Sequence, residues 1–172
     1  MTVVGGTVAG VAAKKLVTFL PVMFVAVGVP IEIGLVESLS RREHERGITF
    51  EVAAETYGKR LQIFKEVLPR LSRVAVLQAH ENANAKFAMA SLERAAPDLA
   101  VNPLQISIGS SAEMASAFDE MERRQCEAVI VIAGVLTYGS GQQIADLALA
   151  HHLPSCHAFG EGWQREARQP RA

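Results

Sequence analysis

The sequence predicts an α/β protein built on parallel, doubly wound sheets. Short continuous apolar runs alternate along the chain with helical stretches of about 10–15 residues. Such uninterrupted apolar runs are typical of strands that are buried on both faces of a parallel sheet. Helical crossovers between parallel strands give a doubly wound arrangement. The 172 residues are 49% hydrophobic and 20% charged, a composition typical of a folded domain and not of a disordered chain.

The charge balance and the cysteines exclude several classes of protein. Seventeen basic and eighteen acidic residues leave a formal charge of −1, without the basic excess of a nucleic-acid-binding domain. Cys126 and Cys156 are too few for a disulfide framework, so either one bridge or two free thiols is expected.

The N-terminal region allows two interpretations. Lys14 and Lys15 precede the apolar run Leu16–Val29, which has the outline of a secretory signal. Pro21 interrupts that run near its start, and acidic residues follow before the roughly 20 apolar residues of a membrane span are reached. We therefore expect a buried strand at Val22–Val27 in place of a signal or a transmembrane helix.

The remaining elements follow from the same periodicity. The expected strands are Thr2–Val4, Val22–Val27, Arg73–Leu77, Val101–Ile108, Ala128–Ile132 and Ser155–Ala158. Apolar residues at helical spacing predict helices over Glu55–Leu68, over Ser111–Arg124 and after Ser140. Ser110 with Glu113, and Ser140 with Gln143, have the spacing of helix N-terminal caps.

A charged segment, Arg41–Gly47, interrupts the pattern. We interpret it as a boundary that separates a first lobe with its crossover (residues 1–47) from a second lobe (residues 48–159). Residues 160–172 form an irregular charged tail. The alternative is a solvated loop within one domain.

Three segments of the chain form a pattern together. The first is Leu20–Pro30 followed by Gly34–Arg41 (GLVESLSR), the second is Tyr57–Leu77 with its GKRL and RVAVL motifs, and the third is Ile144–Phe159. In their residues, order and spacing, these segments resemble the substrate-binding proteins of ABC transporters, in the subfamily associated with aromatic and branched hydrophobic amino acids.

The resemblance implies a type I periplasmic-binding fold with an incomplete first lobe and most of the second, truncated at both ends. It implies a non-enzymatic solute-binding component of an importer, with a small hydrophobic or aromatic amino acid as its ligand and an ABC permease as its partner. The family is periplasmic, whereas the chain as written lacks a convincing signal and would stay in the cytoplasm. The exposed edge of the shortened first sheet favours a homo-oligomer.

Candidate ligand-binding residues follow the expected strands, because open α/β sheets bind ligands at the carboxyl ends of their strands. Backbone N–H groups, the helix dipole and the Thr7 hydroxyl could hold an anion after Gly5-Gly6, although a tight turn alone would also need these small residues. The loop after Leu77 carries four polar residues, Gln78, His80, Asn82 and Asn84, of which Asn84 matches an asparagine of the family. The full candidate set is Gly6, Thr7, Gly28, Val29, Gln78, His80, Asn84, Gly134 and Phe159.

Two of these positions depart from the family. Val29 replaces an aspartate in the turn after the second strand, and Ala133-Gly134 is apolar where many members have an acid. The second change would weaken recognition of an amino group. Phe159 would either line the pocket or belong to the core, and Asn84 is also an ordinary loop and helix-capping residue.

Catalysis and cofactor binding are not expected. His151, His152, Cys156 and His157 could suggest a metal site, but they span a helix end and a strand, so their side chains should diverge. Adjacent strand residues point to opposite faces, which argues against a nucleophilic Cys156–His157 pair. The alternative function is a flavodoxin-like intracellular interaction or sensor module without a transport role. A small hydrolase is a third possibility.

Overall fold

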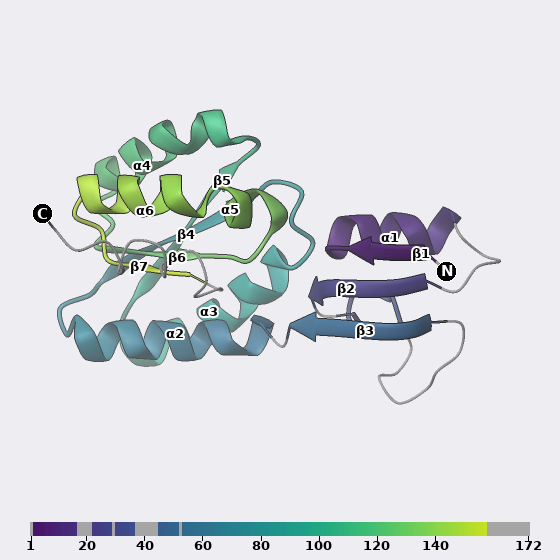
Figure 1. Ribbon diagram of the computed structural model, residues 1–172. Helices are drawn as coiled ribbons and strands as arrows, with labels where there is room; N and C mark the ends of the chain where they lie inside the picture. Colours follow the sequence, from purple (N-terminus) through teal and green to yellow (C-terminus); the bar gives the residue numbers. More distant parts are fainter. Residues whose placement is uncertain (1, 17–21, 29, 37–44, 52, 158–172) are drawn as a thin grey trace, which may run out of the picture.

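The computed structural model describes residues 2–16, 22–28, 30–36, 45–51 and 53–157. These residues form two separate sheets, one with strand order β1-β2-β3 and one with order β5-β4-β6-β7 (Figure 1). Every pair of neighbouring strands is parallel. The predicted α/β class with parallel sheets is therefore confirmed.

The first sheet and one helix form the first lobe (residues 2–51). Its elements are β1 (Thr2–Gly5), α1 (Thr7–Leu16), β2 (Val22–Gly28) and β3 (Glu45–Glu51). Helix α1 packs closely on the sheet at Gly10, where a Cβ atom would lie 3.3 Å from Leu35 Cδ1 and 3.4 Å from Phe24 Cδ1. The Lys14 ammonium donates to the carbonyl oxygens of Gly34 and Leu35 and ties the end of α1 to the turn after β2.

Strand β3 departs from the expected organisation. It pairs with β2 through Phe24↔Ile48 and Gly28↔Glu51, so the first sheet continues past residue 47, where we expected the lobe boundary. Its strand-forming residues, Ile48-Thr49-Phe50, are a short run that directly follows charged residues, so no strand was predicted here. Residues 41–44 of the charged segment lie outside the described residues.

The second lobe (residues 53–157) is a four-stranded sheet with helices on both faces. Its elements are α2 (Ala53–Val67), β4 (Arg73–Ala79), α3 (Ala85–Leu99), β5 (Asn102–Ile108), η1 (Ser111–Glu113), α4 (Met114–Arg123), β6 (Ala128–Val131), α5 (Val135–Gly139), α6 (Gly141–Ala150) and β7 (Ser155–Cys156). Most predicted strands and helices agree with these bounds within a few residues; Ala158, the expected end of the last strand, lies outside the described residues.

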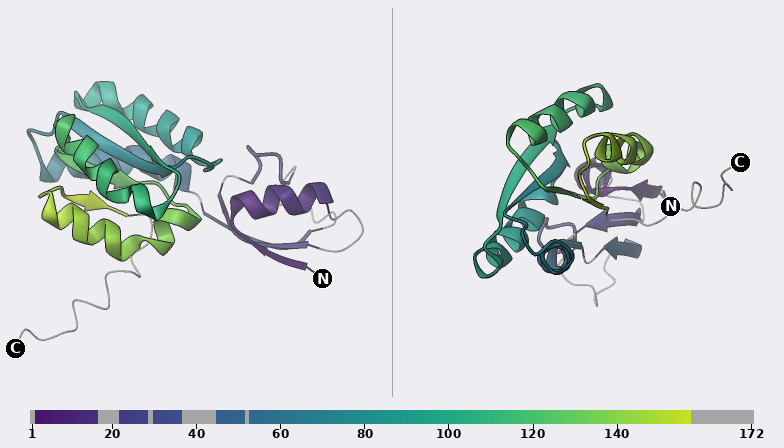
Figure 2. Two further views of the ribbon diagram at one scale, coloured as in Figure 1. Left: turned by 90° about the horizontal axis from the view of Figure 1, so that it is seen from above. Right: turned by 90° about the vertical axis from the view of Figure 1, so that its left-hand side faces the viewer.

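The central strand β4 divides its side chains between two cores. Val74 and Val76 pack with α2 and α3, whereas Ala75 and Leu77 pack with α4 and α6. Figure 1 shows these helix pairs on opposite sides of the sheet, and the end-on view in Figure 2 shows the same layers. Burial on both faces explains why the strands read as continuous apolar runs.

Neither expected helix cap forms as predicted. The Glu113 carboxylate accepts from the Gly109 N–H at 3.0 Å and lies 3.2 Å from Ser110 Oγ, but the Ser110 side chain does not cap the helix. The Ser140 side chain does not cap α6 either: Ser140 directly follows α5 and has φ −105° and ψ 16°, not the extended conformation typical of an N-cap residue. The Gln143 amide donates instead to the carbonyl of Ser111.

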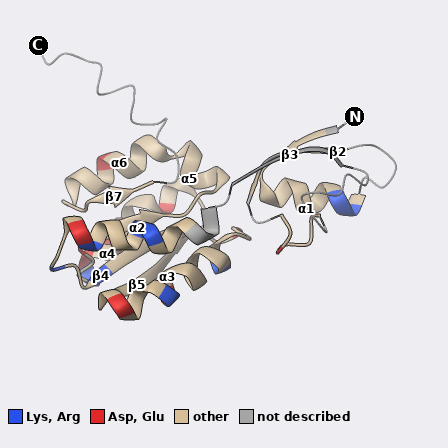
Figure 3. Cartoon of the chain, turned by 90° about the horizontal axis from the view of Figure 1, so that it is seen from below, with Lys and Arg blue, Asp and Glu red and all other residues tan. Residues whose placement is uncertain are grey.

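The two sheets direct the carboxyl ends of their strands toward each other. In Figure 1 the arrowheads of β1–β3 point to the second lobe, and Figure 2 shows the lobes side by side from above. Figure 3 shows acidic and basic positions interspersed on α2 and α3. Within the described part of the chain, no helix has the length and apolar character needed to cross a bilayer.

Candidate functional site

The loops that follow β1, β4 and β6 meet between the lobes. Gly6 and Thr7 come from the first loop, Asn82 and Asn84 from the second, and Ala133–Val135 from the third. Contacts between Thr7 and Asn84, between Asn82 and Ala133, and between Gly6 and Val135 join all three loops. The site therefore lies where open α/β sheets bind their ligands, at the carboxyl ends of parallel strands.

The first-lobe side of the site is a sharp strand-to-helix turn. Gly6 has a φ of +82°, in the left-handed region that favours glycine. A Cβ atom at Gly6 would lie 3.4 Å from Val135 Cγ2 of the second lobe, so the two lobes approach closely here. Thr7, which opens α1, is only 8% exposed.

Asn84 makes the polar contact from the second lobe. Its Nδ2 donates to Thr7 Oγ1 at 3.1 Å, across 77 residues of sequence. Its Oδ1 is buried and has no hydrogen-bond partner. Asn84 precedes α3, but its side chain makes no capping bond to that helix. The amide thus faces the other lobe and retains one free acceptor.

Asn82 joins the second and third loops. Its Nδ2 donates to the Ala133 carbonyl at 2.8 Å, and its Oδ1 accepts from the Asn84 N–H at 3.0 Å. The Ala133 N–H donates to the hydroxyl oxygen of Tyr57, a fully buried residue of α2. The sequence showed Asn82 as one of four polar residues in its loop but did not make it a ligand-binding candidate, because neither Ala133 nor Tyr57 is near it in the sequence.

The other candidate residues occupy different surroundings. Gln78, expected in the loop after Leu77, lies within β4, because the strand continues to Ala79. It is buried and its Nε2 donates to Ser107 Oγ of β5, while its Oε1 has no hydrogen-bond partner. His80 is exposed and lies against Gly109 in the loop after β5, since its Cδ2 is 3.3 Å from the position of a Gly109 Cβ. Gly28 ends β2, whereas Val29 and Phe159 lie outside the described residues.

Exposed apolar side chains come from the two helices that begin at the site. Val8 in the first turn of α1 is 56% exposed, and Val135 and Tyr138 of the short helix α5 are 77% and 62% exposed. Val135 and Tyr138 are three residues apart and share one face of α5. Neither these two residues nor Val8 were candidates from the sequence, because exposure depends on the tertiary fold.

The histidines and cysteines near the C-terminal end have separate environments. His151 Nδ1 lies 3.0 Å from Glu122 Oε2, whereas His157 Nε2 lies 3.2 Å from Ser155 Oγ. Burial lowers the pKa of His157 and raises the pKa of the Cys156 thiol, which disfavours a reactive thiolate. Within the described ranges, no group of three or more His, Cys, Asp or Glu residues is arranged to hold a metal ion.

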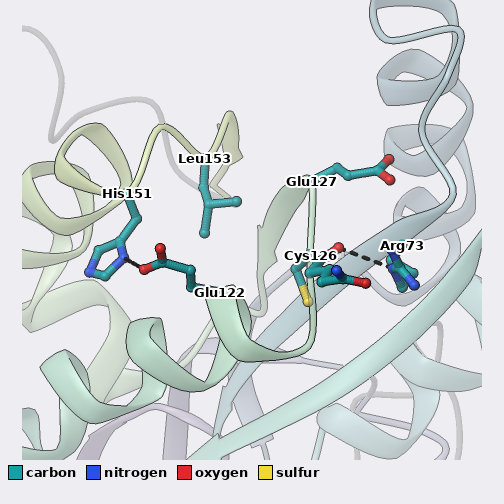
Figure 4. Close-up of a pocket in the computed structure, with 7 residues that line it drawn as sticks. Arg73, Glu122, Cys126, Glu127, His151 and Leu153 are labelled. Atoms are coloured by element: carbon teal, nitrogen blue, oxygen red, sulfur yellow. Dashed lines mark hydrogen bonds and ion pairs between the residues drawn. The ribbon is translucent and has the colours of Figure 1, made fainter.

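A groove of about 350 Å³ lies at the other end of the second sheet (Figure 4). Its charged residues already have partners: Arg73 Nε donates to the Gln125 carbonyl, Glu122 contacts His151, and Glu127 accepts from Ser72. The Ser72 N–H lowers the pKa of Glu127, and burial raises the pKa of Cys126. The lining residues are Arg73, Glu122, Gln125, Cys126, Glu127, His151 and Leu153.

Solved structures with the same fold include proteins of ABC transporters. An ABC domain from Streptococcus pneumoniae in complex with L-Trp matches with a TM-score of 0.78 and 18% identity, covering 92% of this chain and 54% of that one. A conserved domain protein from Vibrio cholerae matches with a TM-score of 0.81 and 20% identity, covering 95% and 54%. A solute-binding protein of an ABC transporter from Rhodopseudomonas palustris, in complex with 3,4-dihydroxybenzoic acid, matches with a TM-score of 0.64 and 16% identity, covering 91% and 42%.

At these identities the likeness establishes the fold, and the chain spans about half the length of the first two structures. A search of curated proteins found no match. The sequence profile of the family described as "ABC transporter substrate binding protein" matches residues 1–154, nearly the whole chain. The resemblance found in the sequence is therefore confirmed, and the chain belongs to the ABC transporter substrate-binding protein family.

Proposed function

We propose that the protein is the non-enzymatic solute-binding component of an ABC-type importer and holds a small hydrophobic or aromatic amino acid between its lobes. The observation that carries this proposal is the Thr7–Asn84 contact, which joins the carboxyl ends of the two sheets. The family match does not favour the alternative of a flavodoxin-like sensor module.

Polar groups at the contact suit the two charges of an amino acid. The N-terminus of α1 and the Thr7 hydroxyl favour a carboxylate, through backbone N–H groups and the helix dipole. The buried Oδ1 of Asn84 lacks a donor and could accept from the ammonium group. It would supply the acceptor that Ala133-Gly134 lacks.

Apolar groups beside the contact suit a hydrophobic side chain. Val8, Val135 and Tyr138 are exposed on the helices that begin there. Burying such surface on a ligand contributes roughly 25 cal/mol per Å². The L-Trp bound in the matching Streptococcus structure supports the same ligand class.

Ligand binding between two lobes can report to a permease through closure. A ligand that contacts both Thr7 and Asn84 would favour the closed arrangement over the open one, and an ABC permease would respond to that difference. This role places the protein in the periplasm, as is typical of its family.

A second copy of the chain is the proposed partner of the first sheet. Among the described strands, β1 pairs only with β2, and its four residues include neither a charge nor a proline to block further pairing. If two copies pair antiparallel about a two-fold axis, Val3, which is 59% exposed, can face its counterpart. A Val3→Cys variant should then form a disulfide-linked dimer, and a micromolar monomer without cross-linking would contradict this.

Thermal unfolding against a panel of amino acids tests the ligand class. A ligand present at a hundred times its dissociation constant adds about 2.7 kcal/mol, or roughly 5–10 °C for a chain of this size. L-Tryptophan, L-phenylalanine and L-leucine should raise the Tm, whereas L-aspartate should not. The shift should disappear in Thr7→Val. A folded protein that no hydrophobic amino acid stabilises would refute the proposed ligand class.

A further inference from the structure

One peptide unit of the second lobe is held from two sides. The Ala133 carbonyl accepts from Asn82 Nδ2 at 2.8 Å, and the Ala133 N–H donates to the Tyr57 hydroxyl at 2.9 Å. Asn82 belongs to the loop after β4, and Tyr57 belongs to α2. The loop after β6 is therefore fixed by two elements that are distant from it in the sequence.

The same Asn82 side chain also orders its own loop. Its Oδ1 accepts from the Asn84 N–H at 3.0 Å, and its backbone carbonyl accepts from the Ala85 N–H at 3.0 Å. Asn84 is the residue whose amide reaches Thr7 in the first lobe. One side chain thus connects the loop after β6 to the interlobe contact.

Gly134 leaves the space that the Asn82 amide needs to reach the Ala133 carbonyl. A Cβ atom at Gly134 would lie 3.1 Å from Asn82 Nδ2, closer than most real contacts, so a larger residue would push the Asn82 amide away. Gly134 has an extended φ of −173°, which any residue can adopt. Its lack of a side chain therefore serves the close approach of Asn82 and not the backbone conformation.

We propose that Asn82 is a positioning residue that joins the loops after β4 and β6 into one rigid unit and so orients Asn84 toward the first lobe. Its connection to ligand affinity rests on the proposed function, whereas its effect on the loops does not. Rigid loops would let binding free energy be used for lobe closure and not for ordering the site.

Hydrogen exchange without ligand tests the joining of the loops. Asn82→Ala should accelerate exchange of the Asn84 and Ala133 amides together and leave the core strands β4 and β6 unchanged. Asn102→Ala, a change at an exposed position at the start of β5, is the matched control and should alter neither amide. Faster exchange at Asn84 alone would overturn the proposal, since the two loops would then be independent.

Two further variants separate positioning from general destabilisation. Asn82→Asp keeps the acceptor for the Asn84 N–H but loses the donor to Ala133, so faster exchange should be confined to the loop after β6. It also serves as the test if Asn82→Ala does not fold. Tyr57→Phe should accelerate exchange of the Ala133 amide while the Asn84 amide stays protected. Loss of protection throughout the lobe in both Asn82 variants would overturn a positioning role for Asn82.

L-Tryptophan is the probe for the effect on binding. Asn82→Ala should weaken its binding roughly five- to tenfold, the order expected when a site must be ordered on binding. Unchanged affinity in a variant with loosened loops would refute the link to the ligand. If the wild-type protein does not bind L-tryptophan, the proposed ligand fails, and the exchange result still decides whether Asn82 joins the loops.

Discussion

The hydrogen bond between Thr7 and Asn84 allows the relative position of the lobes to be tested in solution. We would replace Thr7 by Val, which keeps the branched shape, and Asn84 by Ala, singly and together. The bond is 3.1 Å long and Thr7 is almost fully buried, so a net coupling free energy of about 0.5–1.5 kcal/mol is expected. Each single change should cost about 1–3 kcal/mol, because it leaves a partly buried polar group without this partner.

The assay is equilibrium urea unfolding of the four proteins, followed by circular dichroism, with the coupling taken from the double-mutant cycle. Thr7→Val combined with Asn102→Ala is the control pair and should be additive, since Asn102 lies in β5 and is exposed. Distant sites add to within about 0.3–0.5 kcal/mol. A Thr7–Asn84 coupling below about 0.3 kcal/mol would show that the lobes do not meet at these residues.

Three further predictions concern the second lobe. Gly58→Ala should lower the free energy of unfolding by about 1–3 kcal/mol, measured by urea unfolding, although alanine has the better helix propensity. The reason is that the added Cβ would lie 3.2 Å from the Ser91 carbonyl oxygen of α3. A gain in stability would contradict this close contact between the helices. At pH 8, Cys156 should react with a thiol reagent faster than the more deeply buried Cys126. Both thiols should react more slowly in the folded protein than in denaturant, because burial raises their pKa values. Equal rates in the folded and unfolded protein would contradict this burial. Burial lowers the pKa of His157 below 6.5, so the free energy of unfolding should be highest above pH 6.5. It should fall as the pH drops from 6.5 toward the lowered pKa and level off below that pKa, because only the unfolded state gains a proton in this range. His157→Gln should flatten this dependence, and an unchanged slope in the variant would contradict it.

The strands of the second lobe were predictable because their burial on both faces leaves a strong local signal. Val74–Leu77 is apolar at every position, and the structure buries all four residues. Strand β3 lacked such a signal, because its charged start masks a three-residue apolar and β-branched run. Its place beside β2 depends on pairing with a distant strand, which periodicity does not report.

The site was predictable to the extent that it follows from strand ends. Thr7 and Asn84 each follow a strand and were candidates, and the structure places their side chains in contact. Asn82 and Tyr57 reach Ala133 across 51 and 76 residues of sequence. Such long-range bonds depend on the pairing of β4 with β6 and on the packing of α2 against their sheet, so a local pattern could not identify them.

Within the described residues, the second lobe has two core clusters of fourteen buried residues each, one on either face of its sheet. Neighbouring residues of β4 belong to different clusters, so a shift of one residue in its pairing would move every side chain of the strand to the opposite core. The register of β4 is therefore tied to both layers of helices at once, and a helix layer that packs on one face also fixes the side chains that β4 presents to the other.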